Sequence, residues 1–183
     1  MPLLDPAIGY VILTGGALLF ASAGIHKLRD LSRFTAIFDA YRILPERPVR
    51  RVAWLVPFAE LGVAIMLLWP PAGRPAAVVP AVAVWVVYAG GMYINIARGR
   101  RDLDCGCTMG QGRRAIATWM VYRNLCLAGA LGIAGLPWSS RPLNGVDLVT
   151  VIGGLIVGAT LYASIDRLLG DVLPRTSILR STS

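Results

Sequence analysis

The chain has 183 residues, 56% of them apolar and 15% charged, with a formal net charge of +8. The apolar excess excludes intrinsic disorder, and its arrangement in long blocks excludes most water-soluble enzymes. Because the basic residues lie between the apolar blocks, they favour contact with a lipid bilayer and not with nucleic acid.

Five segments are apolar and long enough to cross a bilayer, which takes about 20 residues in a helix. They cover about 7–28, 51–69, 76–97, 114–135 and 146–168. We therefore predict an all-α, polytopic membrane helix bundle with five transmembrane helices, in which residues 1–183 form a single integral membrane domain. No Lys or Arg precedes the first span, so we expect it not to be a cleaved signal peptide.

The connection after the first span predicts a short amphipathic helix over residues 30–42. Apolar residues recur there at helical spacing, at Leu31, Phe34, Ile37, Phe38 and Tyr41. Such a stripe favours a helix that lies on the membrane surface.

Basic residues are concentrated in alternate connections. The connections after the first and third spans and the C-terminal tail hold 15 Lys and Arg residues, against 2 in the other connections, Arg74 and Arg141. The positive-inside rule then predicts an N-terminus outside and a C-terminus in the cytoplasm.

Two charged residues, Glu60 and Arg123, lie inside the predicted second and fourth spans. Both spans start from the same membrane face, and both charges should lie about 13 Å below it. Because a lone charge at that depth is costly, we predict that Glu60 and Arg123 form an ion pair. The pair would fix the register of the two helices, or it would form the polar end of a quinone pocket or of a proton path.

The third connection contains the strongest candidate for chemistry, Asp104-Cys105-Gly106-Cys107. Two cysteines one residue apart can close a small disulfide ring, and a ring that departs from relaxed geometry is readily reduced. The two neighbouring aspartates, Asp102 and Asp104, oppose the thiolate form of the cysteines. Four nearby arginines favour it, namely Arg100, Arg101, Arg113 and Arg114.

Two alternatives to redox chemistry stay open for these cysteines. They could be incidental loop residues, or half of a metal site. Cys105, Cys107 and His26 are one ligand short of the usual four for zinc, so we expect no metal. His26 ends the first span on the same side of the membrane as the cysteines. It would be their proton shuttle, or an interfacial histidine bonded to backbone.

Small residues in the last two spans are expected to serve packing. Cys126 lies about 18 Å below the start of the fourth span, too deep for direct exchange with Cys105 or Cys107. We therefore expect it to pack against neighbouring helices. In the fifth span, Gly154 and Gly158 fit a small-xxx-small contact face.

Four motifs combine along the chain. G-I-H-K-L-R-D and Y-R-I-L-P lie between Gly24 and Pro45, A-E-L lies in the second span, and G-R-R-D-L-D-C-G-C precedes the fourth. Together, over about residues 7–135, they resemble the MauE family of methylamine utilisation proteins, which is grouped with DoxX-like membrane proteins. In this resemblance His26 and Lys27 match the family's H-K, and Cys105 and Cys107 match its C-G-C.

The resemblance implies a multi-pass protein of the bacterial inner membrane. It implies a role in maturation of the small subunit of methylamine dehydrogenase, an exported substrate rich in disulfides. It also implies a thioredoxin-like, membrane-tethered partner of the MauD type. By analogy with other membrane disulfide systems, a quinone is a candidate electron acceptor, and no other cofactor is indicated.

The leading hypothesis is a membrane thiol–disulfide oxidoreductase in which Cys105 and Cys107 cycle between dithiol and disulfide. The alternatives are a non-enzymatic assembly factor and a small-solute transporter. The charge count places the cysteines at the cytoplasmic face, whereas an oxidase for exported proteins would be expected to present them outside. Either the charge rule fails here, or electrons cross the bilayer indirectly, or the third connection folds back into the bundle.

Overall fold

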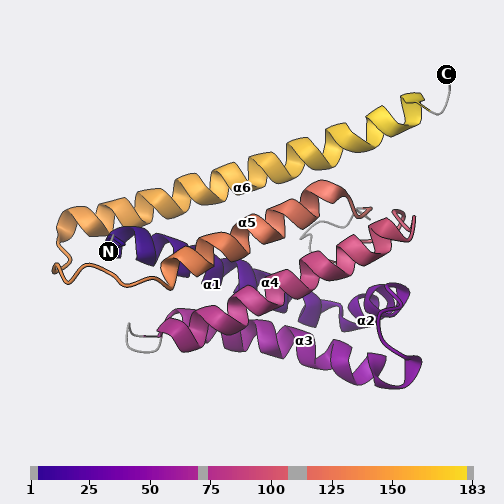
Figure 1. Ribbon diagram of the computed structural model, residues 1–183, viewed down its shortest axis with the longest axis horizontal. Helices are drawn as coiled ribbons and strands as arrows, with labels where there is room; N and C mark the ends of the chain where they lie inside the picture. Colours follow the sequence, from indigo (N-terminus) through magenta and orange to yellow (C-terminus); the bar gives the residue numbers. More distant parts are fainter. Residues whose placement is uncertain (1–3, 70–73, 107–114, 181–183) are drawn as a thin grey trace.

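The computed structural model describes residues 4–69, 74–106 and 115–180, which form six helices and contain only isolated β-bridges (Figure 1). The prediction of an all-α fold is therefore confirmed for this part of the chain. The helices are α1 (Pro6–Arg29), α2 (Leu31–Ala40), α3 (Glu46–Leu67), α4 (Arg74–Ala97), α5 (Thr118–Ala134) and α6 (Gly145–Arg180).

Capping residues mark where α1 and α2 begin. The Asp5 carboxylate accepts a hydrogen bond from the Ala7 amide, and Pro6 occupies the first turn of α1, where its missing N–H costs nothing. Asp30 ends α1 and caps α2 by accepting from the Arg33 amide. That hydrogen bond, with a second from the Ser32 hydroxyl, holds the pKa of Asp30 below its ordinary value. The short helix predicted over 30–42 is confirmed as α2.

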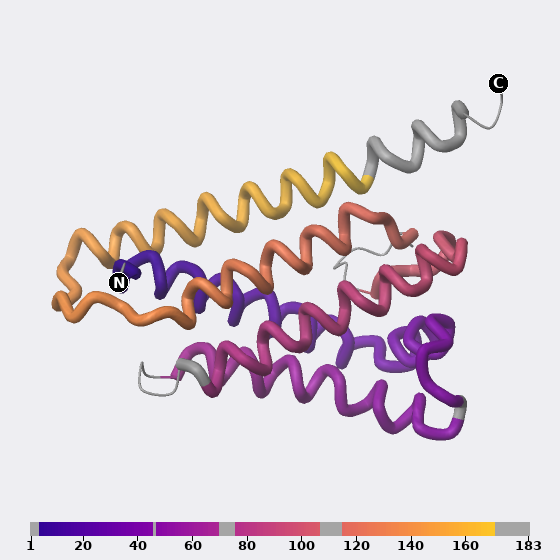
Figure 2. Tube along the Cα trace, in the orientation of Figure 1, coloured from indigo at the N-terminus to yellow at the C-terminus, as the bar shows by residue number. Residues whose placement is uncertain are grey.

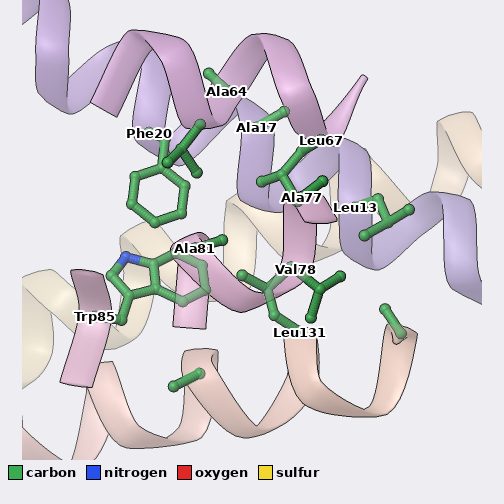
Figure 3. Close-up of a cluster of buried hydrophobic side chains, with 13 residues drawn as sticks. Leu13, Ala17, Phe20, Ala64, Leu67, Ala77, Val78, Ala81, Trp85 and Leu131 are labelled. Carbon is green, nitrogen blue, oxygen red and sulfur yellow. The ribbon is translucent and has the colours of Figure 1, made fainter. Parts of the chain in front are cut away.

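The apolar core lies between α1, α3, α4 and α5 (Figure 3). Phe20 of α1 stacks on Trp85 of α4 with ring centroids 4.7 Å apart, and Leu67 of α3 and Leu131 of α5 are buried in the same cluster. Small side chains fill the remaining contacts and let the helices approach closely. These are Ala17, Ala64, Ala77, Ala81, Ala128 and Ala134.

Three of the described helices are long and apolar enough to cross a membrane, over residues 6–29, 76–97 and 145–170. They coincide with the first, third and fifth predicted spans. The second and fourth spans stay predictions, because α3 includes Arg50, Arg51 and Glu60, and α5 has only 17 residues. The prediction of five transmembrane helices is thus not confirmed.

The connections gather at two opposite ends of the bundle (Figure 2). One end, which we call the α2 end, contains α2, the start of α3, the end of α4 and the start of α5. At the other end the chain near Leu4 bonds to Pro137 and Ser139 of the α5–α6 connection, through bonds of 3.0 and 2.9 Å. The first and third connections therefore share one end, as the sequence predicts.

Helix α6 runs along the outer edge of the bundle and packs mainly against α1 (Figure 1). A Cβ at Gly154 would meet Val11 of α1 at 2.9 Å, so glycine is needed there for the close approach. At Gly158 a Cβ would meet nothing within 4 Å. Only the first glycine of the predicted small-xxx-small face therefore makes a helix contact.

Candidate functional site

Cys105 lies in a cluster of buried apolar side chains between α4 and the start of α5, at the α2 end. It is 7% exposed and packs in a cluster with Met92 of α4 and with Ile116 and Met120 at the start of α5. Its predicted partner Cys107 lies outside the described residues, as do Arg113 and Arg114. The Cys105–Cys107 disulfide therefore stays a prediction, whereas the burial of Cys105 is a property of the structure.

The segment around Cys105 has a backbone shape of its own. An isolated antiparallel bridge joins Asp104 to Ala115, and the Ile116 amide donates to the Leu103 carbonyl at 2.8 Å. The Asp104 carboxylate accepts from the Gly106 amide at 3.2 Å, in a turn where Gly106 has a φ of +66°. That conformation favours glycine, and a Cβ at this position would lie 3.3 Å from Ile37 of α2.

Arginine side chains fasten this segment to α2 and to the end of α4. Arg33 of α2 donates to the Asp104 carboxylate at 3.1 Å. Arg100 donates to the Asn95 side chain at 3.1 Å and to the Ala40 carbonyl at 2.8 Å. The expectation that Arg100 favours a thiolate at Cys105 stays a prediction, and in the structure the Arg100 guanidinium holds the connection in place through these two hydrogen bonds.

A buried ion pair lies beneath α2, on the inner side of Phe34. Lys27 in the last turn of α1 donates to both carboxylate oxygens of Glu60 in α3, at 2.6 and 2.8 Å. The Tyr88 hydroxyl of α4 donates to the same carboxylate at 2.7 Å. Lys27 is 4% exposed and Glu60 is 1% exposed, so three helices contribute to one desolvated polar cluster.

The predicted ion pair between Glu60 and Arg123 is wrong. Glu60 is paired with Lys27, and Arg123 of α5 is paired with Asp166 of α6 at 2.6 Å. The guanidinium of Arg123 also lies over the rings of Trp119 and Tyr162.

The error has a physical cause. Lys27 lies in the last turn of α1, where we counted it with the first connection, and Asp166 lies in the fifth predicted span, where we did not consider it as a partner for Arg123. Their helices carry them far enough into the bundle to neutralise both charges. The H-K motif was the signal that could have found Lys27.

Phe34 separates the buried ion pair from the segment that carries Cys105. The Lys27 ammonium lies 5.4 Å from the Phe34 ring centroid, in a cation–π contact, and 5.3 Å from the Tyr88 ring. On the other side a Cβ at Gly106 would lie 3.9 Å from the Phe34 ring. The lysine of the H-K motif therefore reaches the layer beneath the cysteine segment.

His26 and Cys126 take different places from that cluster. His26 is half-buried on α1 at the α2 end, as predicted, and its role as a proton shuttle stays a prediction. The expectation that Cys126 packs against neighbouring helices is wrong, because it is exposed on the outward face of α5. The inward face of that helix is formed by Met120, Asn124, Ala128 and Leu131 at helical spacing, which leaves Cys126 opposite.

Comparison with known proteins gives one consistent family. The family model described as methylamine utilisation protein MauE matches residues 5–137. The methylamine utilization protein MauE of Paracoccus denitrificans is 37% identical over 160 residues, which are 86% of this chain and 83% of that protein. The protein of the same name from Paracoccus versutus is 37% identical over 161 residues, 87% of this chain and 84% of that protein.

A third relative extends the match. The methylamine utilization protein MauE of Methylophilus methylotrophus is 32% identical over 168 residues, which are 91% of this chain and 88% of that protein. No solved structure matches the chain at a significant level.

Proposed function

The chain belongs to the MauE family of methylamine utilisation proteins, and from this premise we propose that it is a membrane thiol–disulfide redox protein that assists the maturation of an exported protein. The observation that carries the proposal is the position of Cys105. The thiol is enclosed by α4 and α5, and its segment is held to α2 by Arg33 and Arg100. Such fixed placement suits a thiol that must meet one defined partner sulfur.

The burial of Cys105 supports a division of roles between the two cysteines. A thiol that is 7% exposed is poorly placed to meet a sulfur on another protein. We therefore assign the first contact with other proteins to Cys107 and the resolving step to Cys105. In thiol–disulfide exchange the incoming thiolate attacks one sulfur and releases the other as a thiolate.

The proposed cycle balances over two half-reactions. Two thiols of the exported substrate become a disulfide while the Cys105–Cys107 disulfide becomes two thiols. Cys107 then attacks the disulfide of a thioredoxin-like, MauD-type membrane partner. Cys105 displaces that partner from the mixed disulfide, and the partner leaves with two thiols.

A trapping experiment tests these roles in the purified full-length chain, in a Cys126→Ser background. With glutathione disulfide as the probe, we expect Cys105→Ser to keep one glutathione on Cys107, measured by intact mass. The chain that retains both cysteines should release that glutathione and close its internal disulfide, and Cys107→Ser should react slowly. Faster glutathione uptake by Cys107→Ser than by Cys105→Ser would overturn the assignment.

The maturation role is tested in the bacterium that encodes the chain. We expect Cys105→Ser/Cys107→Ser to abolish accumulation of the disulfide-bonded exported substrate, whereas Cys126→Ser should leave it unchanged. If the double variant supports normal accumulation, the chain is a non-enzymatic assembly factor and the redox proposal fails.

We further propose that the chain lies in the bacterial inner membrane with its N-terminus outside and the α2 end in the cytoplasm. The support is the concentration of Lys and Arg in the connections of that end. In this orientation the exported substrate and the Cys105–Cys107 pair lie on opposite faces of the membrane, so electrons from the substrate thiols have to cross the bilayer before they reduce the Cys105–Cys107 disulfide.

A further inference from the structure

One face of α3 forms an open groove at the α2 end of the bundle. Its lining side chains recur every three or four residues and so lie in a single stripe along the helix. They are Arg47, Arg50, Arg51, Trp54, Leu55 and Phe58. All six are exposed, and the three apolar ones are exposed by 52% to 65%. Large apolar side chains are exposed on other helices as well, and this stripe is distinguished by the three arginines that continue it along the same face of α3.

The stripe is divided into a basic half and an apolar half. The three arginines occupy the first turns of α3, and the apolar side chains follow one turn further along the helix. The rings of Trp54 and Phe58 are stacked with centroids 6.5 Å apart. Arg51 and Phe58 are separated by about 10 Å along the helix axis. Polarity therefore changes from cationic to apolar over the length of a lipid headgroup and its first methylenes.

The arginines of the stripe are available for a ligand. Among the described residues, no carboxylate forms an ion pair with Arg47, Arg50 or Arg51, whereas Arg33 and Arg123 are each paired with one carboxylate and Arg141 with two. Guanidinium groups bind phosphate through paired hydrogen bonds, and tryptophan favours the interface between headgroups and acyl chains.

We propose that this face of α3 binds one anionic phospholipid, with its phosphate on Arg47, Arg50 and Arg51 and an acyl chain along Trp54, Leu55 and Phe58. The order of the basic and apolar halves along α3 is the reason for proposing a phospholipid as the ligand. A free anion would bind the arginines and contact none of the three apolar side chains. An apolar helix from a partner would leave the arginines unused. The proposal is independent of the redox function.

Trp54 provides the probe for a direct test. The full-length chain is reconstituted in phosphatidylcholine vesicles containing a minor fraction of phosphatidylglycerol brominated on its acyl chains. Fluorescence quenching is measured for the native chain and for Trp54→Phe. The difference between the two is the quenching of Trp54 alone, without that of the other tryptophans. We expect Trp54 to be quenched as if brominated phosphatidylglycerol were enriched about tenfold over brominated phosphatidylcholine at the same fraction.

A matched pair of variants separates a site from a general surface charge. Arg47→Gln/Arg50→Gln/Arg51→Gln should abolish the enrichment. Arg29→Gln/Arg42→Gln/Arg101→Gln removes the same charge from exposed positions at the same end and should keep it. Circular dichroism confirms that each variant keeps its helix content.

Three outcomes would overturn the proposal. The first is equal quenching by the two brominated lipids. The second is loss of the enrichment in both triple variants, which would mean a diffuse surface potential. The third is quenching of Trp54 that depends on the protein-to-lipid ratio and not on the lipid headgroup, which would make the stripe an interface between copies of the chain.

Discussion

At the scale of single residues, the Glu60 carboxylate depends on two donors from other helices. Lys27 and Tyr88 bring three short hydrogen bonds to a side chain that is only 1% exposed. Burying both charges gains little over an apolar pair, but removing one partner leaves the other uncompensated. The cluster therefore favours the one packing of α1, α3 and α4 in which Lys27 and Tyr88 both reach Glu60.

Replacing Lys27 by methionine should destabilise the bundle by about 3–5 kcal/mol, because Glu60 is left buried without its cation. Denaturant unfolding in detergent, followed by circular dichroism, measures the change. The double variant Lys27→Met/Glu60→Leu is the control and should recover most of the loss. A single variant as stable as the native chain would contradict this view of the pair.

Gly106→Ala should displace the segment that carries Cys105. The substitution adds strain at φ +66° and places a Cβ 3.3 Å from Ile37. Gly99→Ala is a matched control, since its φ of +76° carries similar strain and its Cβ would meet nothing within 4 Å. We expect maleimide to modify Cys105 several times faster in Gly106→Ala than in Gly99→Ala, measured without Cys107 and Cys126. Equal rates would show that contact with α2 does not hold the segment.

The residues of the candidate site were only partly predictable from the sequence. The sequence shows the motif around Cys105, and it shows that Glu60 lies within an apolar segment. Their neighbours are not, because the rotation of each helix about its axis decides which side chains meet. Lys27 was counted with the first connection, and Asp166 of the fifth span was not considered as a partner for Arg123.

At the scale of the elements, α3 and α5 begin at residues that hydropathy does not indicate. Helix α3 starts at Glu46, before the predicted 51, because arginine favours helix and the first turns of a helix need not lie in the apolar block. Helix α5 starts at Thr118, after the predicted 114, because Ala115 and Ile116 are bonded to Asp104 and Leu103. Apolar length predicts that a helix exists, whereas local hydrogen bonds decide where it starts.

The start of α1 should loosen from α6 in acid. Arg141 donates to the carboxylates of Asp5 and Asp147, which ties the two helices together. The hydrogen bonds from Arg141 hold the pKa of Asp5 below its ordinary value of 3.8. Because the folded pKa is depressed, the tie contributes fully above pH 3.8 and is lost as the pH falls through the lower, folded value.

Trp138 reports on this contact, since it packs against Gly9 and Tyr10 of α1. We expect its fluorescence to change below pH 3.8 in the native chain. In Arg141→Gln the tie is already absent, so the change should occur at a higher pH or be lost. An identical acid transition in both proteins would contradict the role of Arg141.

At the scale of the whole molecule, the bundle has one basic end and one end with few charges. The sequence predicted this asymmetry because alternate connections of a membrane bundle lie at the same end, and the basic residues are concentrated in alternate connections. The ties from Arg33 and Arg100 confirm that the first and third connections meet. Which membrane face that end occupies depends on the bilayer and the insertion machinery, and the charge count is the evidence for it.

Single cysteines placed in a cysteine-free chain test the orientation. Ser32 is exposed on α2 and Ser140 is exposed in the α5–α6 connection at the opposite end. We expect an impermeant maleimide to label Ser140→Cys in intact cells and Ser32→Cys only in inverted vesicles. The reverse pattern would place the α2 end, and Cys105 with it, outside the cytoplasm.

The central claim is that Cys105 and Cys107 form a redox pair in the working protein. The most direct measurement traps native membranes of a Cys126→Ser strain in acid and alkylates the chain with a maleimide polymer, with and without prior reduction. The account predicts a population that gains two labels only after reduction, and that grows when the membranes are exposed to glutathione disulfide. Two labels in every unreduced sample, including the oxidised one, would contradict it.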